Sequence, residues 1–270
     1  MCCNLCFGYG KIKQALEKEG RTMTFRTIKW FTQVACSLLR LVPKMKKGVK
    51  LKNTGDLSVY KPFVDEELKK WLNPLMKSAG VEFVVSGKEN IPEDEAVIYV
   101  PNHQGLFDMP AIILNAPTPC GFIAKKELEK VPIVRTWMWL LDCVFIDREN
   151  KREARVAIKE AIELINKGRS MVIFPEGTRS RDGIPLPFKS GVMMIAKETK
   201  AKIVPVVLEG IIDRFEGTKN ITPGTVTVKF LPAIETENLS REEMKAMPEQ
   251  IREKIVAVLK EDGAIPSDAE

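Results

Sequence analysis

The only histidine of this 270-residue chain, His103, lies five residues before Asp108 in the segment NHQGLFD, residues 102–108. On one continuous helix, five residues separate two side chains by about 140°, so the pair would diverge. A strand ending at His103, followed by a turn at Gln104 and Gly105, would instead let them meet. A carboxylate beside one imidazole nitrogen fixes the tautomer and stabilises the imidazolium. The other nitrogen is then free to accept a proton as a general base.

The same two residues also fit a hydrogen-bonded structural histidine, with Asp108 as an ordinary residue at the start of a helix. The HxxxxD spacing by itself does not decide between these readings. A metal site is not expected, because without a second histidine only carboxylates or thiolates would remain as ligands.

A second polar segment, FPEGTRSRDG at residues 174–183, follows a short apolar run. It combines a glycine-containing turn with the hydroxyl of Thr178 and the guanidinium groups of Arg179 and Arg181. Backbone N–H groups and arginine together form a good phosphate cradle. The alternative is a polar surface loop with ordinary turn residues.

The elements that must position these segments alternate regularly along the chain from residue 80, after a lead-in helix. Runs rich in β-branched and aromatic residues predict strands, and segments with helical spacing or helix caps predict helices between them. Strands are expected at residues 81–87, 96–101, 121–125, 143–147, 170–174, 203–210 and 225–230. Helices are expected at residues 64–80, 107–115, 132–141, 153–168, 190–200 and 240–262. This order indicates a layered α/β domain with a mostly parallel mixed sheet, whose ligands bind at the carboxyl ends of the strands.

The net charge of +6 is concentrated at the N-terminus. Residues 1–52 carry 12 Lys/Arg and 2 acidic residues, a local charge of +10, and the remainder carries 30 and 34, a local charge of −4. A basic arm suits an anionic membrane surface or a nucleic acid. We expect no nucleic-acid partner, since the rest of the chain has neither a nucleic-acid-binding motif nor a run of basic and aromatic residues.

Residues 22–43 resemble a membrane segment, but the uncharged run from residue 30 to residue 39 spans only about 15 Å of helix. A bilayer core needs roughly 30 Å, so a transmembrane span is not expected. At helical spacing the segment has a wide apolar face and a narrow basic one, and the lysine-rich run KMKKGVKLK follows it. We expect a helix lying in the plane of the membrane, with residues 22–52 as the contact surface. Packing of the helix on its own domain is the alternative.

The six cysteines carry little information. No secretory signal precedes them, so free thiols in a reducing compartment are expected. Cys3 and Cys6 form a single CxxC, which is a weak metal or redox signal. Together with Cys2, these residues fit a mobile terminus, with lipidation as the minority reading.

The two polar segments, about 70 residues apart in this order, resemble those of the glycerolipid acyltransferases, most closely the 1-acylglycerol-3-phosphate (lysophosphatidic acid) acyltransferases. NHQGLFD matches the family's NHxxxxD block, GFIAKKEL with FIDR at residues 145–148 the second, FPEGTRSRDG the third, and IVPVVLEG the fourth. PFKSG at residues 187–191 matches the stretch after the third block. The resemblance covers roughly residues 80–230. It departs where the second block often has glycines, near Arg135 and Asp142.

The resemblance implies that His103, oriented by Asp108, deprotonates the sn-2 hydroxyl of lysophosphatidic acid, which then attacks an acyl thioester. No acyl-enzyme and no cofactor are implied, and acyl-CoA or acyl carrier protein would be the co-substrate. The glycerol phosphate would be held by Glu176, Gly177, Thr178 and Arg179, with Arg148 and Lys125 adding positive charge. Residues 133–145 would line the acyl channel or simply pack in the core.

We therefore expect a basic arm with an interfacial helix at residues 1–63 and a catalytic domain at residues 64–270. The protein would lie peripherally on the cytoplasmic face of a membrane and make phosphatidic acid for phospholipid biosynthesis. The rival functions are acyl transfer to another lysophospholipid, thioester hydrolysis with His103 activating water, and catalytically silent lipid binding. The donor, the chain length, the oxyanion donors and the oligomeric state stay open at this point.

Overall fold

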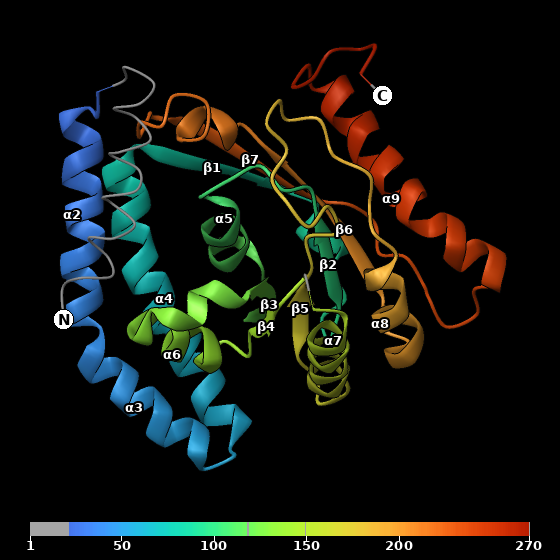
Figure 1. Ribbon diagram of the computed structural model, residues 1–270, viewed down its shortest axis with the longest axis horizontal. Helices are drawn as coiled ribbons and strands as arrows, with labels where there is room; N and C mark the ends of the chain where they lie inside the picture. Colours follow the sequence, from blue (N-terminus) through green and yellow to red (C-terminus); the bar gives the residue numbers. More distant parts are fainter. Residues whose placement is uncertain (1–21, 118, 149, 270) are drawn as a thin grey trace.

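The computed structural model describes residues 22–117, 119–148 and 150–269. Its centre is a seven-stranded sheet with helices on both faces (Figure 1). The strands are β1 (Val81–Ser86), β2 (Ile98–Pro101), β3 (Cys120–Lys125), β4 (Val144–Ile146), β5 (Ser170–Val172), β6 (Ile203–Glu209) and β7 (Gly224–Phe230). Their order across the sheet is β1-β7-β6-β2-β5-β3-β4.

All neighbouring strands are parallel except β6 and β7, which pair antiparallel. The predicted mostly parallel mixed sheet is therefore confirmed. Strands β2 and β5 are buried along their whole length, as expected for central strands covered by helices on both faces. Because β2, β3, β4, β5 and β6 run in one direction, the loops that follow them meet at one edge of the sheet.

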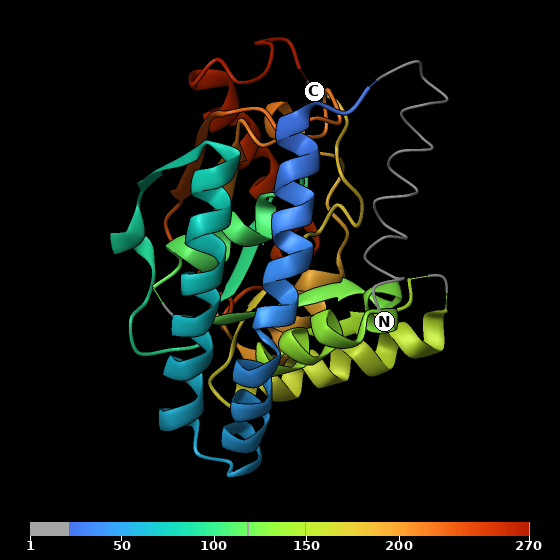
Figure 2. The same ribbon diagram turned by 90° about the vertical axis from the view of Figure 1, so that its left-hand side faces the viewer.

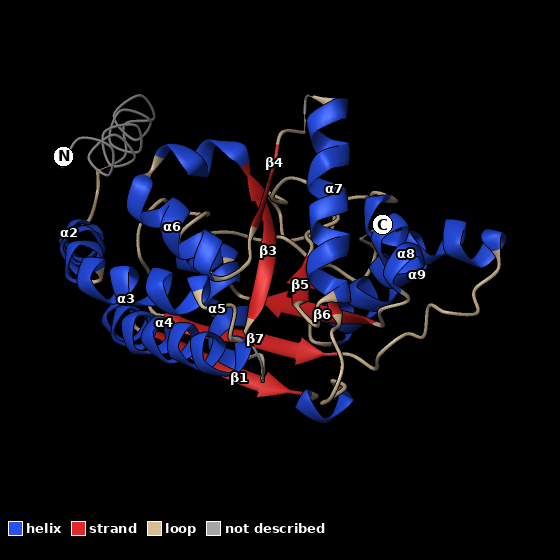
Figure 3. Ribbon diagram, turned by 90° about the horizontal axis from the view of Figure 1, so that it is seen from below, coloured by secondary structure: helices blue, strands red, loops and turns tan. Residues whose placement is uncertain are grey.

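The helices cover the two faces in separate groups (Figure 3). They are α2 (Phe25–Arg40), α3 (Val42–Asn53), α4 (Leu57–Ala79), α5 (Asp108–Asn115), α6 (Pro132–Leu140), α7 (Lys151–Asn166), α8 (Gly191–Thr199) and α9 (Arg241–Glu261). One hydrophobic core forms between the sheet and α2, α4, α5 and α6, and a second forms between the sheet and α7, α8 and α9. Three short 3₁₀ segments, η1 (Lys88–Asn90), η2 (Lys126–Lys130) and η3 (Ile212–Arg214), complete the element order.

All seven predicted strands and six predicted helices of the α/β region are present. Their bounds agree within two residues, apart from α4, which begins seven residues earlier than expected. The expected division at residue 63 falls inside this continuous helix. The lysine-rich run KMKKGVKLK, predicted as an arm segment, lies within α3, where Gly48 is buried against Leu140 and Phe63.

Helix α2 divides its apolar surface between two environments. Trp30 and Leu38 are buried in the first core, and the Trp30 indole N–H donates to the carbonyl of Leu75 on α4 at 2.9 Å. Figure 2 shows the two helices side by side. Phe25, at 81% exposed, and Leu39, at 54%, point outward. The helix thus packs on its own domain, as the alternative interpretation expected, and still leaves an exposed apolar stripe.

Among the residues that the structure describes, no helix combines the length and apolar character needed to cross a membrane. In the same part of the chain, no group of three or more histidine, cysteine or acidic side chains is placed to hold a metal ion. Cys2, Cys3 and Cys6 lie outside the described residues.

Candidate active site

The catalytic candidate His103 lies in the loop that joins β2 to α5, and the side chains on either side of it anchor this loop to β6 and the residues after it. At its start, the Asn102 side chain exchanges two hydrogen bonds with the backbone of Leu208 on the neighbouring strand β6, at 2.9 and 2.8 Å. Gln104 accepts the backbone N–H of Ile211 at 3.1 Å. The loop therefore takes its shape from the strand beside it.

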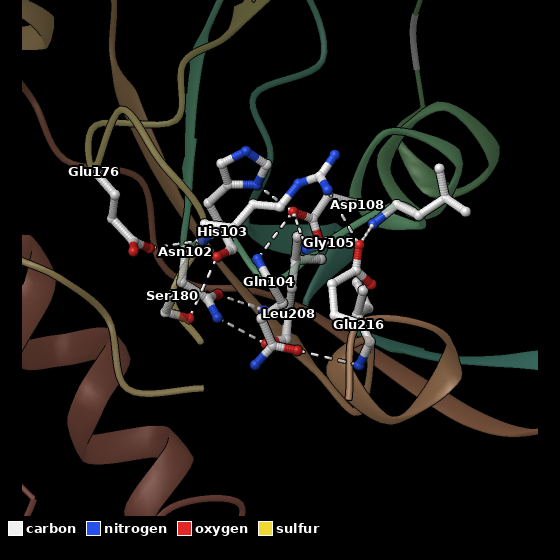
Figure 4. A network of polar contacts seen from close by, with 12 residues as sticks. Asn102, His103, Gln104, Gly105, Asp108, Glu176, Ser180, Leu208 and Glu216 are labelled. Atoms are coloured by element: carbon white, nitrogen blue, oxygen red, sulfur yellow. Dashed lines mark hydrogen bonds and ion pairs between the residues drawn. The ribbon is translucent and has the colours of Figure 1, made fainter. Parts of the chain in front are cut away.

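Asp108, the first residue of α5, closes the loop onto His103 (Figure 4). One oxygen, Oδ2, accepts three hydrogen bonds: from the imidazole Nδ1 at 2.5 Å and from the backbone N–H groups of Gln104 and Gly105 at 2.9 Å each. The carboxylate is fully buried. The predicted meeting of His103 and Asp108 is confirmed, and the turn lies slightly later than predicted, with a bend at Gly105 and turn residues at Leu106 and Phe107.

The imidazole ring is held from one side and open on another. Its ring centroid lies 4.3 Å from that of Phe174, and its side chain is 19% exposed. Because Nδ1 is engaged by Asp108, Nε2 is the nitrogen left to exchange a proton with a molecule in the adjoining cavity. A buried carboxylate, an oriented imidazole and an open nitrogen are the parts of a general base.

The segment after β5 meets His103 because β5 pairs in parallel with β2. Glu176 is 2% exposed, and its two oxygens accept the backbone N–H groups of His103 at 2.7 Å and Leu186 at 3.1 Å. Ser180 donates its backbone N–H to the carbonyl of His103 at 2.9 Å. Both backbone groups of His103 are thereby fixed by the segment that was expected to bind phosphate.

The structure thus gives Glu176 a different position from the expected one. Its carboxylate turns inward and does not border the cavity, and burial raises its pKa to about 7. In this structure the Glu176 carboxyl group supports the backbone around His103 and Leu186, and its role as a phosphate contact stays a prediction. Sequence reasoning missed this orientation because it places the residue in the loop and cannot determine which way its side chain points.

The rest of the EGTR turn does reach the cavity. Gly177 has a φ of +73°, which glycine adopts without strain, and Thr178 and Arg179 are exposed. A Cβ at Gly177 would lie 2.6 Å from the Lys189 amino group, so this cation rests directly on the turn. Lys189 was not among the predicted site residues, although the PFKSG stretch was a signal for it.

These residues border one open cavity of about 1490 Å³ at the carboxyl edge of the sheet. Drug-sized ligands usually occupy roughly 300–1,000 Å³, so the space suits a larger molecule. Its basic side chains come from the end of β3 and from the segments that follow β3, β4, β5 and β6. Its apolar side chains include those of residues in β3, in α5 and in the segments that follow β2 and β5. The bordering residues include His103, Leu106, Met109, Phe122, Lys125, Lys126, Lys130, Arg148, Phe174, Gly177, Thr178, Arg179, Arg181, Glu216 and Lys219.

The two more distant cationic candidates follow β3 and β4. Lys125 ends β3 and forms an exposed ion pair with Glu127 at 2.7 Å, and Arg148 follows β4. The structure therefore brings Lys125 and Arg148 to the cavity that His103 and Arg179 also border. Helix α6 belongs to the segment that was expected to line an acyl channel or to pack in the core. Three of its side chains are buried in the first core: Trp137, Met138 and Leu140.

Glu216 is a further site residue that sequence reasoning did not find. It lies in the loop after β6, accepts the backbone N–H of Leu106 at 2.8 Å, and forms an ion pair with Arg179 at 3.3 Å. A Cβ at Gly105 would lie 2.2 Å from its carboxylate, so the glycine allows the Glu216 side chain to lie directly against the loop. No motif marks Glu216, because it is brought to the site only by the position of β6 beside β2.

Asp142, one of the two departures from the second block, has a structural explanation. Its φ of +58° is favoured by glycine,. The carboxylate accepts hydrogen bonds from Lys52 on α3 and Tyr60 on α4, at 2.7 Å each, and pairs with Arg169 at 2.5 Å. A buried ion network therefore replaces glycine here and ties the N-terminal helices to the sheet.

Comparisons with known proteins find a matching family, related sequences and a related solved structure. A profile of the family described as Acyltransferase matches residues 82–209. The 1-acyl-sn-glycerol-3-phosphate acyltransferase of Borreliella burgdorferi is 34% identical over 67% of this chain and 73% of its own length. The crystal structure of the 1-acyl-sn-glycerophosphate (LPA) acyltransferase PlsC from Thermotoga maritima superposes with a TM-score of 0.72 at 30% identity, covering 90% of this chain and all of that one.

The chain belongs to the acyltransferase family. Within the acyltransferase family it is also similar to the Saccharomyces cerevisiae 1-acyl-sn-glycerol-3-phosphate acyltransferase, at 34% identity over 70% of this chain and 63% of that protein. The human 1-acyl-sn-glycerol-3-phosphate acyltransferase alpha is 30% identical over 67% of this chain and 65% of its own length. The chain thus spans slightly less than two thirds of these two relatives. The matched acyltransferase region contains His103, Asp108 and the EGTR turn, and ends before Glu216.

Proposed function

We propose that the protein transfers a fatty acyl group from a thioester donor to the sn-2 hydroxyl of lysophosphatidic acid, which gives phosphatidic acid. The observation that carries this proposal is the oriented imidazole of His103 at the edge of the cavity that Arg179 also borders. His103 would supply the general base, and Arg179 would bind the anionic phosphate of the acceptor. The names of the related proteins supply the acceptor.

In the proposed reaction, His103 Nε2 accepts the proton of the sn-2 hydroxyl as its oxygen bonds to the thioester carbonyl carbon. The resulting tetrahedral intermediate expels the donor's thiolate, which takes the proton from the imidazolium. The buried carboxylate of Asp108 stabilises that imidazolium. The N–H groups of Gln104 and Gly105 are committed to Asp108, so in this arrangement neither is available to the oxyanion.

The acceptor's phosphate would bind at the EGTR turn. Arg179 is half-exposed, and a guanidinium offers several N–H donors in one plane. Gly177 and Thr178 would add backbone and hydroxyl donors, and Lys189 would add charge. Lys125 and Arg148, farther along the cavity wall, suit either the same phosphate or the phosphates of acyl-CoA or acyl carrier protein as donor.

We also propose that α2 and α3 hold the protein on the cytoplasmic face of a membrane without crossing it. The support is the exposed stripe formed by Phe25, Ile28 and Leu39 on α2, with Lys29 and Arg40 beside it and four exposed lysines on α3. Apolar side chains can enter the headgroup boundary. Each lysine near an anionic leaflet contributes roughly 1 kcal/mol.

The activity test measures transfer from acyl-CoA and from acyl carrier protein to lysophosphatidic acid in liposomes, for the wild type and His103→Ala. We expect phosphatidic acid from the wild type and a loss of about 100-fold or more in the variant. Thiol release that is independent of lysophosphatidic acid would indicate a hydrolase. If the protein transferred the acyl group only to a different lysophospholipid, that lipid would replace lysophosphatidic acid as the proposed acceptor. Equal activity in both proteins would make His103 a structural residue.

The membrane test measures flotation with vesicles that contain anionic lipid. The double variant Phe25→Ser with Leu39→Ser should bind clearly less than the wild type. Val156→Ser is the matched control, because Val156 on α7 is similarly exposed, at 62%, and lies on the other group of helices. Equal loss in both variants would contradict a specific contact through α2.

A further inference from the structure

Glu216 occupies an unusual position for an acidic residue. Its side chain is 12% exposed and borders the same cavity as His103 and Arg179. Figure 4 shows it beside Gly105 and Asp108. Only Oε1 has partners, the backbone N–H of Leu106 and the Arg179 guanidinium. Oε2 is buried and has no hydrogen-bond partner among the described residues.

The two partners of Oε1 form an anion site. A backbone N–H and a guanidinium that converge on one point are the groups that bind phosphate oxygens in proteins. In this chain a carboxylate already occupies that point. The distance from Arg179 Nη1 to Oε1 is 3.3 Å, longer than the roughly 2.7–2.9 Å of a tight charge-assisted bond. The Arg179 side chain is 53% exposed and can turn to another anion.

We propose that Glu216 is an exchange partner of Arg179, which the phosphate of the acceptor displaces, and that it thereby limits affinity for phosphate-bearing acceptors. The inference rests on the proposed function, since it takes Arg179 as the phosphate contact. When the acceptor binds, Arg179 moves its ion pair from the carboxylate to the phosphate. When the phosphate-bearing product leaves, Glu216 takes the guanidinium back.

The electrostatic setting makes this exchange dependent on pH. Burial is the main cause that raises the pKa of Glu216 to about 7; Arg179, the Leu106 N–H and Lys219 oppose this increase, and Asp108 adds a smaller contribution to it. His103 borders the same cavity. Below this pKa the neutral carboxyl group competes weakly for Arg179. Above it, the carboxylate both pairs with Arg179 and repels a phosphate dianion.

The test compares KM values of the wild type and Glu216→Gln for lysophosphatidic acid at pH 6 and pH 8. The glutamine keeps an oxygen for the Leu106 N–H and removes the charge. We expect its KM to be lower than that of the wild type by about 5- to 10-fold at pH 8, and by less than about twofold at pH 6. With 1-monoacylglycerol, an acceptor without phosphate, the two proteins should have equal KM values at both pH values.

Asp213→Asn is the matched control, because Asp213 lies three residues earlier in the same loop and its side chain is 72% exposed. It removes one negative charge without touching Arg179 and should leave both KM values unchanged. Glu216→Asp, which shortens the reach to Arg179, should also lower the KM at pH 8. This second variant carries the test if the glutamine variant does not fold.

A KM for lysophosphatidic acid that is equal or higher in Glu216→Gln at pH 8 would overturn the inference, because Glu216 would then orient Arg179 instead of competing for it. An equal decrease in Asp213→Asn, or with 1-monoacylglycerol, would overturn it as well. Arg179→Gln separates this inference from the proposed function. If that variant does not raise the KM, the phosphate site itself is wrongly placed.

Discussion

Replacing Asp108 by asparagine tests the central part of the site, the pairing of a buried carboxylate with His103. Oδ2 accepts three hydrogen bonds and is fully buried. Asparagine keeps one acceptor oxygen but removes the charge that stabilises the imidazolium. Loss of a buried, hydrogen-bonded counter-charge costs roughly 3–5 kcal/mol, and each 1.36 kcal/mol corresponds to about tenfold in rate. We therefore expect kcat to fall by about 10²- to 10⁴-fold.

The same substitution should leave the KM for lysophosphatidic acid within about threefold, because Arg179 and the EGTR turn do not contact Asp108. It should also lower the free energy of unfolding by roughly 1–3 kcal/mol. The reason is that the new amide N–H₂ would point to the buried position of Oδ1, which has no partner among the described residues.

The assay is steady-state acyl transfer, with thermal unfolding measured on the same preparations. Asp262→Asn is the matched control, since Asp262 pairs with Lys229 at 2.6 Å and neither residue borders the cavity. A folded Asp108→Asn protein that keeps kcat within tenfold of the wild type would refute the reasoning. In that case the short contact to His103 would be structural.

Three further predictions concern stability. Gly121→Ala should lower the free energy of unfolding, measured by urea titration, by about 1–3 kcal/mol. The reason is that its Cβ would lie 2.3 Å from the backbone oxygen of Asp142. Gly191→Ala is the control and should change the free energy of unfolding little, because nothing lies within 4 Å of its Cβ. Asp142→Asn should cost about 3–5 kcal/mol and lower the melting temperature, since it leaves Lys52 and Arg169 without a counter-charge; an unchanged melting temperature would contradict the network. The pKa values of Glu176 and Glu216 are raised to about 7 by burial, above the usual value of a glutamate. Their contribution to stability is therefore present below about pH 4.5 and is lost as the pH rises through 7, and urea titrations at pH 5 and pH 8 should show a smaller loss in Glu216→Gln than in the wild type.

The sequence predicted the elements well because their signals are local. Burial on both faces makes β2 apolar and β5 largely so, and the amphipathic spacing of α7 marks a helix that the structure contains. The largest differences between the predicted and observed helix bounds lie in the N-terminal part of the described chain. There the lysines of α3 obscured a helix whose apolar side packs on α6, and α4 begins seven residues earlier than its pattern indicated.

The sequence also placed the two motifs at the carboxyl ends of strands, but it did not determine the direction of each side chain. Glu176 turns into the protein and holds the backbone of His103, whereas Arg179, three residues later, faces the cavity. Such differences depend on which backbone N–H groups a neighbouring loop presents. That neighbour is set by the pairing of β2 with β5, two strands about 70 residues apart.

By itself, the sequence determined the order of strands and helices from residue 64 onward, the proximity of His103 and Asp108, and the family to which the chain belongs, because each of these depends on short segments whose own residues are close together in the chain. The tertiary structure alone decided the strand order, the inward position of Glu176, the two faces of α2, and the contact between Glu216 and Arg179. These depend on contacts between distant segments, whose geometry is fixed only when the sheet assembles and both cores pack against it.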